Sequence, residues 1–410
     1  MADTDPTYTQ PDDYYHPDNR AKFGPLLEIP DQRLISVARK VRDHYFARQT
    51  PANARVEVES RYAGSKYLIH VIRFEESGTV TKQVIRIPAT GWGSRWTREE
   101  HNHLEETARR QIHLKNVLEM PVPVILDCTA HCANDINAPF IAETCCRGES
   151  LSFAWSKEHP AIPLEERRFE SLRSLAQAMK ALSRYTHANL ECVRSERANP
   201  MSILRLTRRR SEITLSDRRK GADRMIGRLV RQLLPLVRCA GDFVLRKQSL
   251  DLKDVFVNEM GTVTGIVDWD GATPFPRCLG TIRPPSWICM DWDPALVKLS
   301  MSSELPSSAV MQQWREYYYG CYLGDGSAQD DPAGEHRWCH AAHIYELIWE
   351  AYMQPSQRVA ACQVITNRVN RSDVRVSSRR ELESIHASVE PDWSVLDAGL
   401  AELTNQAGYV

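Results

Sequence analysis

The sequence predicts an α+β protein with two domains, the first built around a small antiparallel sheet and the second mainly helical. Three observations lead to this class. The 410 residues exceed what one compact core usually contains. Residues 56–88 alternate apolar and polar side chains around turn signals, as antiparallel strands do. Beyond residue 150, long segments instead repeat their apolar residues at helical spacing.

The chain ends and the overall charge limit the classes of partner. Residues 1–22 are acidic and contain prolines without an apolar run, which predicts a disordered tail rather than a secretory signal. Residues 401–410 are expected to form a second tail. No segment approaches the roughly 18 apolar residues that span a membrane. Since 52 basic residues nearly balance 53 acidic ones, nothing indicates a nucleic-acid or membrane partner. We expect a cytoplasmic protein that acts on a small molecule.

The first domain is expected over residues 23–147, and its strands come first. Three segments rich in β-branched residues are separated by turn signals and predict an antiparallel meander. They are residues 56–64, 66–80 and 82–88. A helix follows, because Thr97 and Glu100 have the spacing of a capping box. Its apolar face is expected to contain Leu104, Ala108 and Ile112.

A second domain is expected over residues 148–400. The segment APFIAETCCRGESL reads as a strand that runs into a connecting turn near Gly148. Residues 163–185 then predict a long amphipathic helix. Residues 205–224 carry eight basic and three acidic side chains. A phosphate-binding role competes there with a solvated helix face or an insertion loop, which we favour because no aromatic residues interleave the charges.

The segment GDFVLRKQSLDLKDVFVNEMGTVTGIVDWD carries the most chemistry. Two apolar runs, VFV and TGIVDW, surround the turn NEMG and predict a hairpin. Asp254 stands before one strand and Asp268 ends the other, so the hairpin is expected to bring both carboxylates to the same end. Two converging acidic oxygens suit a magnesium ion that bridges nucleotide phosphates. The alternative is that both acids flank the hairpin simply because turns are solvated.

These segments resemble the aminoglycoside phosphotransferase-like family, particularly its fungal branch, over residues 55–352. The segment TGIVDWDGATPFPRCLGTIRPPSW is the most specific match. AGSKY resembles the turn that covers the phosphates, VIRIP the third strand and APFIAE the hinge. The resemblance implies a two-lobed protein-kinase-like fold, with residues 245–270 as a catalytic-loop-like segment. It also implies ATP and Mg²⁺ as cofactors if phosphotransfer is retained.

The catalytic loop departs from the pattern of that family, which reads His, Gly or Pro, Asp, four residues, then Asn. The resemblance places Asp268 on the metal-binding acid and Asp254 on the Asn. Ser249 then falls on the catalytic Asp and Lys247 on the His. Three of the principal chemical positions therefore differ, which puts efficient phosphotransfer in doubt.

The exchanged residues are not equivalent in their chemistry. Asp254 still offers an oxygen ligand to a divalent cation. Ser249 cannot accept a proton near neutral pH. Asp251 is the nearest carboxylate that could act as the base instead, although alternation along an extended loop aims it away from where Ser249 points.

The first domain also carries an exchanged residue. The strand VIRIP offers Arg86 where the family usually has a lysine that binds nucleotide phosphates and a helix glutamate. The expected partner is Glu106 or Glu105. Gly64 and Ser65 are expected to contact the nucleotide from the phosphate-covering turn. The alternative for Arg86 is an ordinary ion pair.

Three hypotheses follow for the function. We rank first a non-phosphorylating enzyme of fungal natural-product metabolism that cyclises, isomerises or performs a cycloaddition on a hydrophobic metabolite. Lys247 would polarise a substrate carbonyl there and Ser249 would donate a hydrogen bond. An ATP- and Mg²⁺-dependent phosphotransferase acting on a small-molecule hydroxyl ranks second, and a non-catalytic pseudokinase-like binding protein third.

The second domain also supplies many aromatic and histidine side chains. Several aromatic residues would suit a hydrophobic substrate, although each one singly reads equally well as core packing. These are Trp269, Trp287, Trp292, Tyr345, Trp349 and Tyr352. The histidines His336, His340 and His343 read as structural residues rather than ligands.

Overall fold

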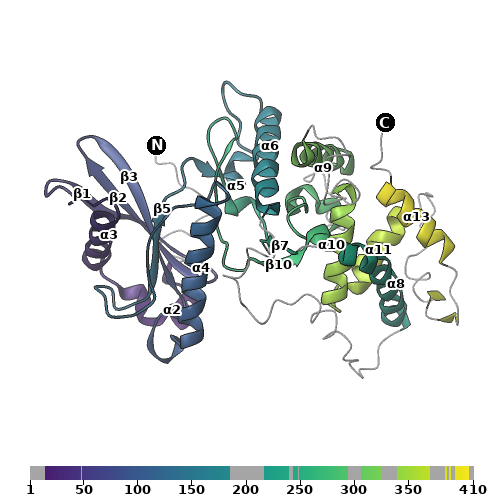
Figure 1. Ribbon diagram of the computed structural model, residues 1–410, viewed down its shortest axis with the longest axis horizontal. Coiled ribbons are helices and arrows are strands. Elements are labelled where there is room, and N and C mark those ends of the chain that lie inside the picture. The colour runs from purple at the N-terminus through teal and green to yellow at the C-terminus, as the bar shows by residue number, and fades with distance from the viewer. Residues whose placement is uncertain are drawn as a thin grey trace. The chain divides into compact units, whose positions relative to one another are not determined.

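The chain forms two compact units in the computed structural model (Figure 1). The structure describes residues 14–47, 49–184, 217–239, 243–247, 249–293, 306–324, 339–369, 384–385, 387–388 and 393–405. Unit 1 comprises Met1–Arg167 and Leu252–Asp270, and unit 2 comprises Arg168–Asp251 and Gly271–Val410. Unit 1 contains the larger sheet and unit 2 is mainly helical, so the predicted α+β class is confirmed.

Unit 1 is built on a five-stranded antiparallel sheet with the strand order β1-β2-β3-β5-β4. The strands are β1 (Arg55–Ala63), β2 (Tyr67–Glu76), β3 (Thr79–Pro88), β4 (Ile125–Thr129) and β5 (Phe140–Thr144). The first three strands form the predicted meander. The later strand β5 pairs with β3, so that Arg86 lies opposite Ile141.

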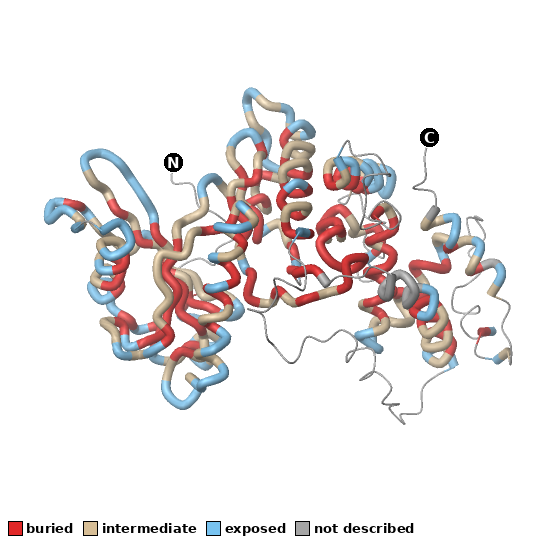
Figure 2. Tube along the Cα trace, in the orientation of Figure 1, coloured by how far each residue is buried: buried red, intermediate tan, exposed pale blue. Residues whose placement is uncertain are grey.

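The two faces of this sheet pack against different helices (Figure 1). Alternate side chains such as Leu68 and Ile72 pack against one set of helices. These are α2 (Pro17–Phe23), η1 (Gly24–Glu28) and α3 (Asp31–Tyr45). The opposite face, which carries Tyr67 and Ile141, packs against α4 (Arg98–Asn116). Figure 2 shows the buried residues concentrated along the strands between these helices.

The segment before the first strand differs from the expectation of a disordered tail over residues 1–22. Residues 17–22 belong to helix α2, and Tyr14 is buried against the sheet core. Pro17 stands in the first turn of the helix, where its missing N–H costs nothing. The correction arises because apolar residues further along, such as Phe23, give this segment a core to join. Residues 1–13 lie outside the described residues.

Helix α4 begins as predicted but turns a different face inward. The side chain of Thr97 accepts a hydrogen bond from the Glu100 amide at 3.3 Å. Leu104 and Ala108 are buried as expected, whereas Ile112 is 41% exposed and Gln111 is buried in its place. The expectation for Ile112 is therefore wrong. The buried face of the helix continues from Ala108 to Gln111, three residues on, and not to Ile112, four residues on. Both spacings are compatible with 3.6 residues per turn.

The predicted hairpin forms in unit 1. Its strands β8 (Val255–Val257) and β9 (Val263–Ile266) pair with each other, and β8 also pairs with β6 (Glu149–Ser150). In the turn, the Gly261 amide donates to the Asn258 carbonyl at 2.9 Å. The short helices η5 (Leu252–Asp254) and α5 (Leu151–Ala154) flank this sheet.

The unit boundaries differ from the expected division at residues 147 and 148. Unit 1 extends to Arg167 and includes residues 252–270, which we expected in the second domain. The pairing of β8 with β6 accounts for part of this difference. Arg110 on α4 adds a hydrogen bond to the Trp269 carbonyl at 3.1 Å.

Unit 2 confirms the prediction of a mainly helical second domain. Helix α8 packs against α10 and α11, and α11 packs against α13. Its helices are α6 (Leu164–Ser183), which begins in unit 1, α8 (Asp217–Cys239), α9 (Ser308–Leu323), α10 (Ala342–Met353), α11 (Arg358–Val369) and α13 (Ser394–Asn405). Strands β7 (Phe243–Arg246) and β10 (Thr273–Pro276) form an antiparallel pair.

Both units also contain short 3₁₀ segments. They are η2 (Gly93–Arg95) in unit 1, and η6 (Arg277–Leu279), η7 (Ser286–Ile288), η8 (Met290–Trp292) and η11 (Cys339–Ala341) in unit 2. Of the basic stretch 205–224, residues 205–216 lie outside the described residues and the rest begins α8. Within the described part of the chain, none of the helices combines the length and the apolar character needed to cross a membrane.

Candidate functional site

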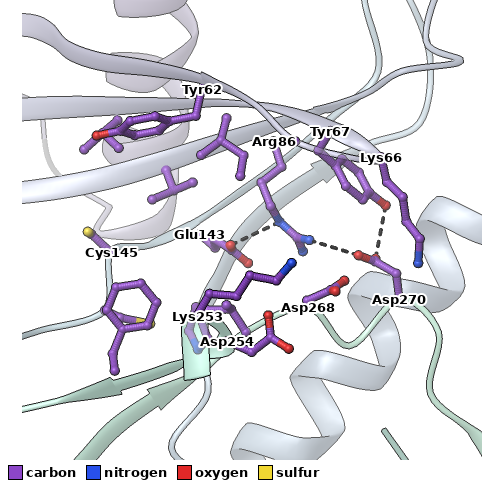
Figure 3. A pocket seen from close by; sticks show the side chains of 18 of the residues that line it. Tyr62, Lys66, Tyr67, Arg86, Glu143, Cys145, Lys253, Asp254, Asp268 and Asp270 are labelled. Atoms are coloured by element: carbon purple, nitrogen blue, oxygen red, sulfur yellow. Dashed lines mark hydrogen bonds and ion pairs between the residues drawn. The ribbon is translucent and has the colours of Figure 1, made fainter. Parts of the chain in front are cut away.

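Unit 1 contains a cavity of about 340 Å³ that is lined mainly by three parts of the chain (Figure 3). The turn between β1 and β2 forms one wall and includes Gly64, Ser65 and Lys66. The inner face of β2, β3 and β5 forms the second wall. Residues 253–270 of the hairpin supply the third wall. All lining residues belong to unit 1.

The turn from β1 to β2 is held by hydrogen bonds of both the amide and the carbonyl of Gly64. The Gly64 amide donates to the Tyr67 carbonyl at 2.8 Å, which closes the turn. Lys22 on α2 donates to the Gly64 carbonyl at 2.8 Å. Gly64 and Ser65, expected from the sequence to contact a nucleotide, therefore line the cavity on a turn that α2 supports.

Arg86 lies on the inner face of β3 and is 7% exposed. Its Nε forms an ion pair with Glu143 Oε1 at 3.1 Å, and its Nη1 forms one with Asp270 Oδ2 at 3.4 Å. Nη2 donates to Gln111 Oε1 at 3.4 Å. Burial opposes the charge of Arg86, but the carboxylates of Glu143 and Asp270 outweigh it and raise the pKa of Arg86.

The expected pairing of Arg86 with Glu106 or Glu105 is wrong. Glu105 pairs with His101 at 3.3 Å and with Arg109 at 3.4 Å. Glu106 is not among the residues that line the cavity. The reason is the inward face of α4, which presents the neutral amide of Gln111 to Arg86 and not an acid from one turn earlier.

Glu143, which the sequence reading missed, supplies the negative charge instead. It lies on β5 opposite Val84, so that Arg86 is its diagonal neighbour on the same face of the sheet. Its Oε2 accepts a hydrogen bond from Gln111 at 2.8 Å. Burial raises the pKa of Glu143, although Arg86 and Gln111 oppose this shift. An acid within the apolar segment APFIAE was the available signal, because a buried charge requires a partner.

Asp254 and Asp268 line the same cavity, as expected from the hairpin (Figure 3). Asp254 ends η5 and is 4% exposed. Asp268 is exposed and has a φ of 60°, in the left-handed region that non-glycine residues rarely adopt. Such strain is often found at functional positions.

The donor set of these two acids suits a magnesium ion. Both supply hard carboxylate oxygens, and magnesium keeps several waters and takes further oxygens from phosphates. Within the described ranges, no group of three or more His, Cys, Asp or Glu side chains could hold a metal ion. Protein ligands alone would therefore not complete the coordination of a metal at this place.

Asp270 is a third acid of the cavity that the sequence reading did not assign. Its side chain is 1% exposed, and Oδ1 accepts a hydrogen bond from the Tyr67 hydroxyl at 3.1 Å. Burial raises the pKa of Asp270, but Arg86 and the Tyr67 hydroxyl more than offset this and lower it. Burial, and after it the neighbouring Asp270, raises the pKa of Tyr67. Figure 3 shows Tyr67, Arg86 and Asp270 joined in this way.

The remaining predicted site residues belong to unit 2. Lys247 is 5% exposed, and its Nζ donates to the Ser249 carbonyl at 2.5 Å. The side chain of Ser249 is exposed. Asp251 accepts a hydrogen bond from the Ser286 hydroxyl at 3.3 Å. The ammonium group of Lys247 thus contacts the backbone of the segment to which it belongs.

A smaller cavity of about 140 Å³ lies within unit 2. Arg283, Glu346 and Glu350 line it together with Trp292 and His343. Arg283 Nη1 lies 3.3 Å from Glu346 Oε1, and Arg246 pairs with the same oxygen. Burial and the neighbouring Glu346 raise the pKa of Glu350 to about 7.

Most of the aromatic and histidine side chains singled out from the sequence pack in cores. Trp292 lines the cavity of unit 2, and Tyr352 is half-buried. The others are buried, namely Trp269, Trp287, Tyr345 and Trp349. His343 bonds with the Tyr319 hydroxyl at 3.0 Å, and burial lowers its pKa well below the usual value. His340 packs edge-on against Tyr319, whereas His336 lies outside the described residues.

Comparison with known proteins finds matches among solved structures alone. No protein-family model and no curated protein matches the sequence. Among solved structures, a proposed aminoglycoside phosphotransferase from Ralstonia eutropha is 12% identical, with a TM-score of 0.45 over 92% of this chain and 98% of that chain. The GDP complex of aminoglycoside 2'-phosphotransferase-IIIa is 14% identical, with a TM-score of 0.44 over 86% and 98%. An ethanolamine kinase from Plasmodium vivax is 12% identical, with a TM-score of 0.42 over 92% and 91%. The antiparallel sheet of unit 1 and the helices of unit 2 together give an α+β fold.

Proposed function

We propose that the cavity of unit 1 binds ATP with Mg²⁺, and that the protein is a divergent phosphotransferase acting on the hydroxyl group of a small molecule. One observation carries the proposal: Asp254 and Asp268 line the same cavity as the turn Gly64–Lys66 and the buried Arg86. Phosphoryl transfer relies mainly on positioning and on compensation of phosphate charge. These residue types in one cavity suit that task.

Each part of the cavity has a separate role in this proposal. Asp254 and Asp268 would hold Mg²⁺, which when bound neutralises charge on the phosphates. The Lys66 ammonium of the turn, which lines the cavity, would face the phosphates. The apolar side chains of β2, including Ile69 and Val71, line the part of the cavity that suits a flat base.

The exchange at Ser249 makes the proposed enzyme slow. A hydroxyl cannot take the proton of the acceptor alcohol at neutral pH, and a general base usually contributes about 10²-fold or more. The transition state of phosphoryl transfer is largely dissociative, so positioning alone still accelerates the reaction. Asp251, which accepts a hydrogen bond from Ser286, remains the nearest carboxylate in the sequence.

Calorimetric titration with MgADP tests the proposal. Asp268→Asn removes a metal-ligand charge from an exposed residue, so we expect affinity for MgADP to fall about tenfold or more. Asp135→Asn is the matched control, because Asp135 pairs with Lys40 at the surface of the same unit and away from this cavity. Equal affinities of wild type and Asp268→Asn, or no binding by wild type, would exclude the nucleotide site.

Turnover is tested separately by restoring the carboxylate that the family has in its loop. Ser249→Asp is expected to raise ATP turnover about tenfold to hundredfold, because it returns a proton acceptor to the exposed position 249. Ser249→Asn, which has the same size without the charge, is the control. A rate unchanged by Ser249→Asp would show that the missing base does not limit the protein.

A second candidate is a non-phosphorylating conversion of a hydrophobic metabolite, such as a cyclisation, cycloaddition or isomerisation. It is favoured by the contacts of Arg86, whose Nη1 and Nη2 donate hydrogen bonds to protein acceptors and whose Nε is ion-paired with Glu143. Such reactions depend on cavity shape and a few polar groups. The hydrogen bond of Lys247 to the Ser249 carbonyl does not support the role of Lys247 as a cation that polarises a substrate carbonyl. Conversion of a metabolite at an equal rate with and without MgATP would favour this candidate.

A further inference from the structure

The guanidinium group of Arg86 is surrounded by protein groups. Nε faces Glu143 at 3.1 Å, Nη1 faces Asp270 at 3.4 Å and Nη2 faces Gln111 at 3.4 Å. The ring of Tyr67 covers the guanidinium, with 5.0 Å between the guanidinium carbon and the ring centroid. A guanidinium binds phosphate through two N–H groups along one edge. These contacts use three of the five N–H groups, so a phosphate that binds along the edge facing Glu143, Asp270 or Gln111 must replace that partner.

Glu143 and Gln111 are the harder partners to replace. Gln111 donates to Glu143 at 2.8 Å and to the Pro123 carbonyl at 3.1 Å, so the two side chains hold each other. Glu143 also lies on a central strand of the sheet. Asp270 instead follows the end of β9, on the hairpin that carries Asp268. It is the partner that a ligand would displace with the least change to the sheet.

The charges around Arg86 explain why its present partners resist an anion. Of the groups that contact the guanidinium, Glu143 and Asp270 carry two negative charges against its single positive charge, and Lys66 adds a positive charge that acts on Asp270. The side chains of Glu143 and Asp270 are 7% and 1% exposed, so water screens them poorly. An added phosphate would bring more negative charge to this buried group. Without the charge of Asp270, Arg86 and Glu143 would balance.

We infer that Asp270 is an internal counter-anion that occupies the anion-binding edge of Arg86 and competes there with the phosphates of a ligand, thereby setting affinity for nucleotides. The inference rests on the proposed function of this cavity. Tyr67 contributes by holding Asp270 Oδ1 at 3.1 Å, which keeps the carboxylate on Arg86. Asp268 is thus expected to increase the affinity for nucleotides and Asp270 to decrease it, although the two residues are only two positions apart.

The opposite effects expected of Asp268→Asn and Asp270→Asn on the affinity for phosphate ligands provide the test. Calorimetric titrations compare MgADP, sodium tripolyphosphate and adenosine on wild type, Asp270→Asn and Asp268→Asn. Asp270→Asn keeps the shape and the hydrogen bond from Tyr67 but removes the charge. We expect it to bind MgADP and tripolyphosphate about tenfold more tightly than wild type. Arg86 would then be available to form one more charged hydrogen bond with the ligand, and about tenfold is the affinity that such a bond contributes. Its affinity for adenosine, which lacks phosphates, should not change.

Tyr67→Phe provides a second variant that does not alter any acid. The ring stays on Arg86 while the hydroxyl that holds Asp270 is lost, so a smaller gain of affinity for tripolyphosphate is expected, about twofold to threefold. A misfolded variant would lose affinity, so a gain cannot arise from damage to the fold.

Each outcome decides between the inference and the proposed function. If wild type binds MgADP and Asp268→Asn weakens it, but Asp270→Asn binds no more tightly, only the inference fails. If tripolyphosphate binds Asp270→Asn more tightly while MgADP binds no variant, Asp270 competes with phosphates at Arg86, but the nucleotide site fails and with it the claim that Asp270 sets nucleotide affinity. If neither probe binds any variant, both fail. A gain for adenosine equal to that for MgADP would also overturn the inference, because the effect would not depend on phosphate.

Discussion

At the scale of single residues, His70 is a buried group that the proposed chemistry does not use. It lies on β2 with 0% exposure, and neither ring nitrogen has a hydrogen-bond partner among the described residues. Its ring packs edge-on to Tyr14, with 6.3 Å between the centroids. Burial, and to a lesser extent the charge of Arg61, lowers the pKa of His70 to about 3. The residue is therefore neutral in the folded protein.

This shift makes stability depend on pH. Below the usual pKa of 6.5 the unfolded chain takes up a proton that folded His70 does not, so stability falls as the pH drops from 6.5 towards 3. We expect His70→Phe to abolish this share of the acid sensitivity. Between pH 7 and pH 5 the variant should lose about 2 kcal/mol less unfolding free energy than wild type, measured by urea unfolding.

A surface histidine supplies the control for this measurement. His103 is exposed on α4, and His103→Gln should leave the difference between pH 7 and pH 5 as it is in wild type. If His70→Phe and wild type lose equal stability on acidification, His70 is protonated in the folded state and the proposed burial of a neutral ring is wrong.

At the scale of elements, two glycines test how the hairpin that carries the acids is held. Gly148 has a φ of +87°, and a Cβ there would lie 2.0 Å from the Val257 carbonyl oxygen of β8. Gly78, in the turn between β2 and β3, has a φ of +81° with open space around it. Alanine at position 78 pays only for the backbone conformation, about 1 kcal/mol. Gly148→Ala adds a clash and is expected to cost about 3 kcal/mol or more.

The two alanine variants are compared by thermal and urea unfolding. Because both have similar backbone angles, the difference between them isolates the close approach of Gly148 to β8. We also expect Gly148→Ala, but not Gly78→Ala, to weaken MgADP binding, since β8 directly follows Asp254. If both variants lose the same unfolding free energy, the backbone at the β6–β8 contact moves to accept the Cβ of residue 148 without further destabilisation.

The elements that could be predicted from the sequence are those determined by neighbouring residues. Strands β1 to β3 and the turn at Asn258–Gly261 follow from alternation and from turn residues a few positions apart. Helix α2 could not be predicted in this way. Its segment is polar and begins with a proline, and it is ordered through burial of Phe23 in a core formed by strands far along the chain.

At the scale of the whole molecule, the site also combines contacts between residues close in the sequence with contacts between distant ones. Asp254 and Asp268 flank one hairpin, so their meeting in the cavity follows from local pairing. Asp270 instead meets Arg86 across 184 residues and Tyr67 across 203. No periodicity connects such distant positions, and the pairing of Arg86 with Glu143 depends on the order of strands in the sheet. The sequence therefore predicted which residue types to expect but assigned Arg86 the wrong partner.

The two units are also expected to respond to pH in opposite directions. Acidification weakens unit 1 through His70. In unit 2, burial and Glu346 raise the pKa of Glu350 from 4.5 to about 7. Between these two pH values the folded state therefore holds a proton on Glu350 that the unfolded chain has released. This contribution is fully present below pH 4.5 and is lost as the pH rises through about 7. Arg283 opposes the shift without cancelling it.

Hydrogen exchange followed by mass spectrometry can follow both units in the intact chain. After correction for the intrinsic exchange rates, lowering the pH from 7.5 to 5.5 should reduce protection in β2 and increase it in α10. Glu350→Gln keeps the side-chain size without the titration, so it should remove the increase in α10 and leave β2 unchanged. His70→Phe should do the reverse. If both units instead lose protection together on acidification in every variant, neither group controls the pH response, and Glu350 is ionised in the folded protein like an ordinary surface glutamate.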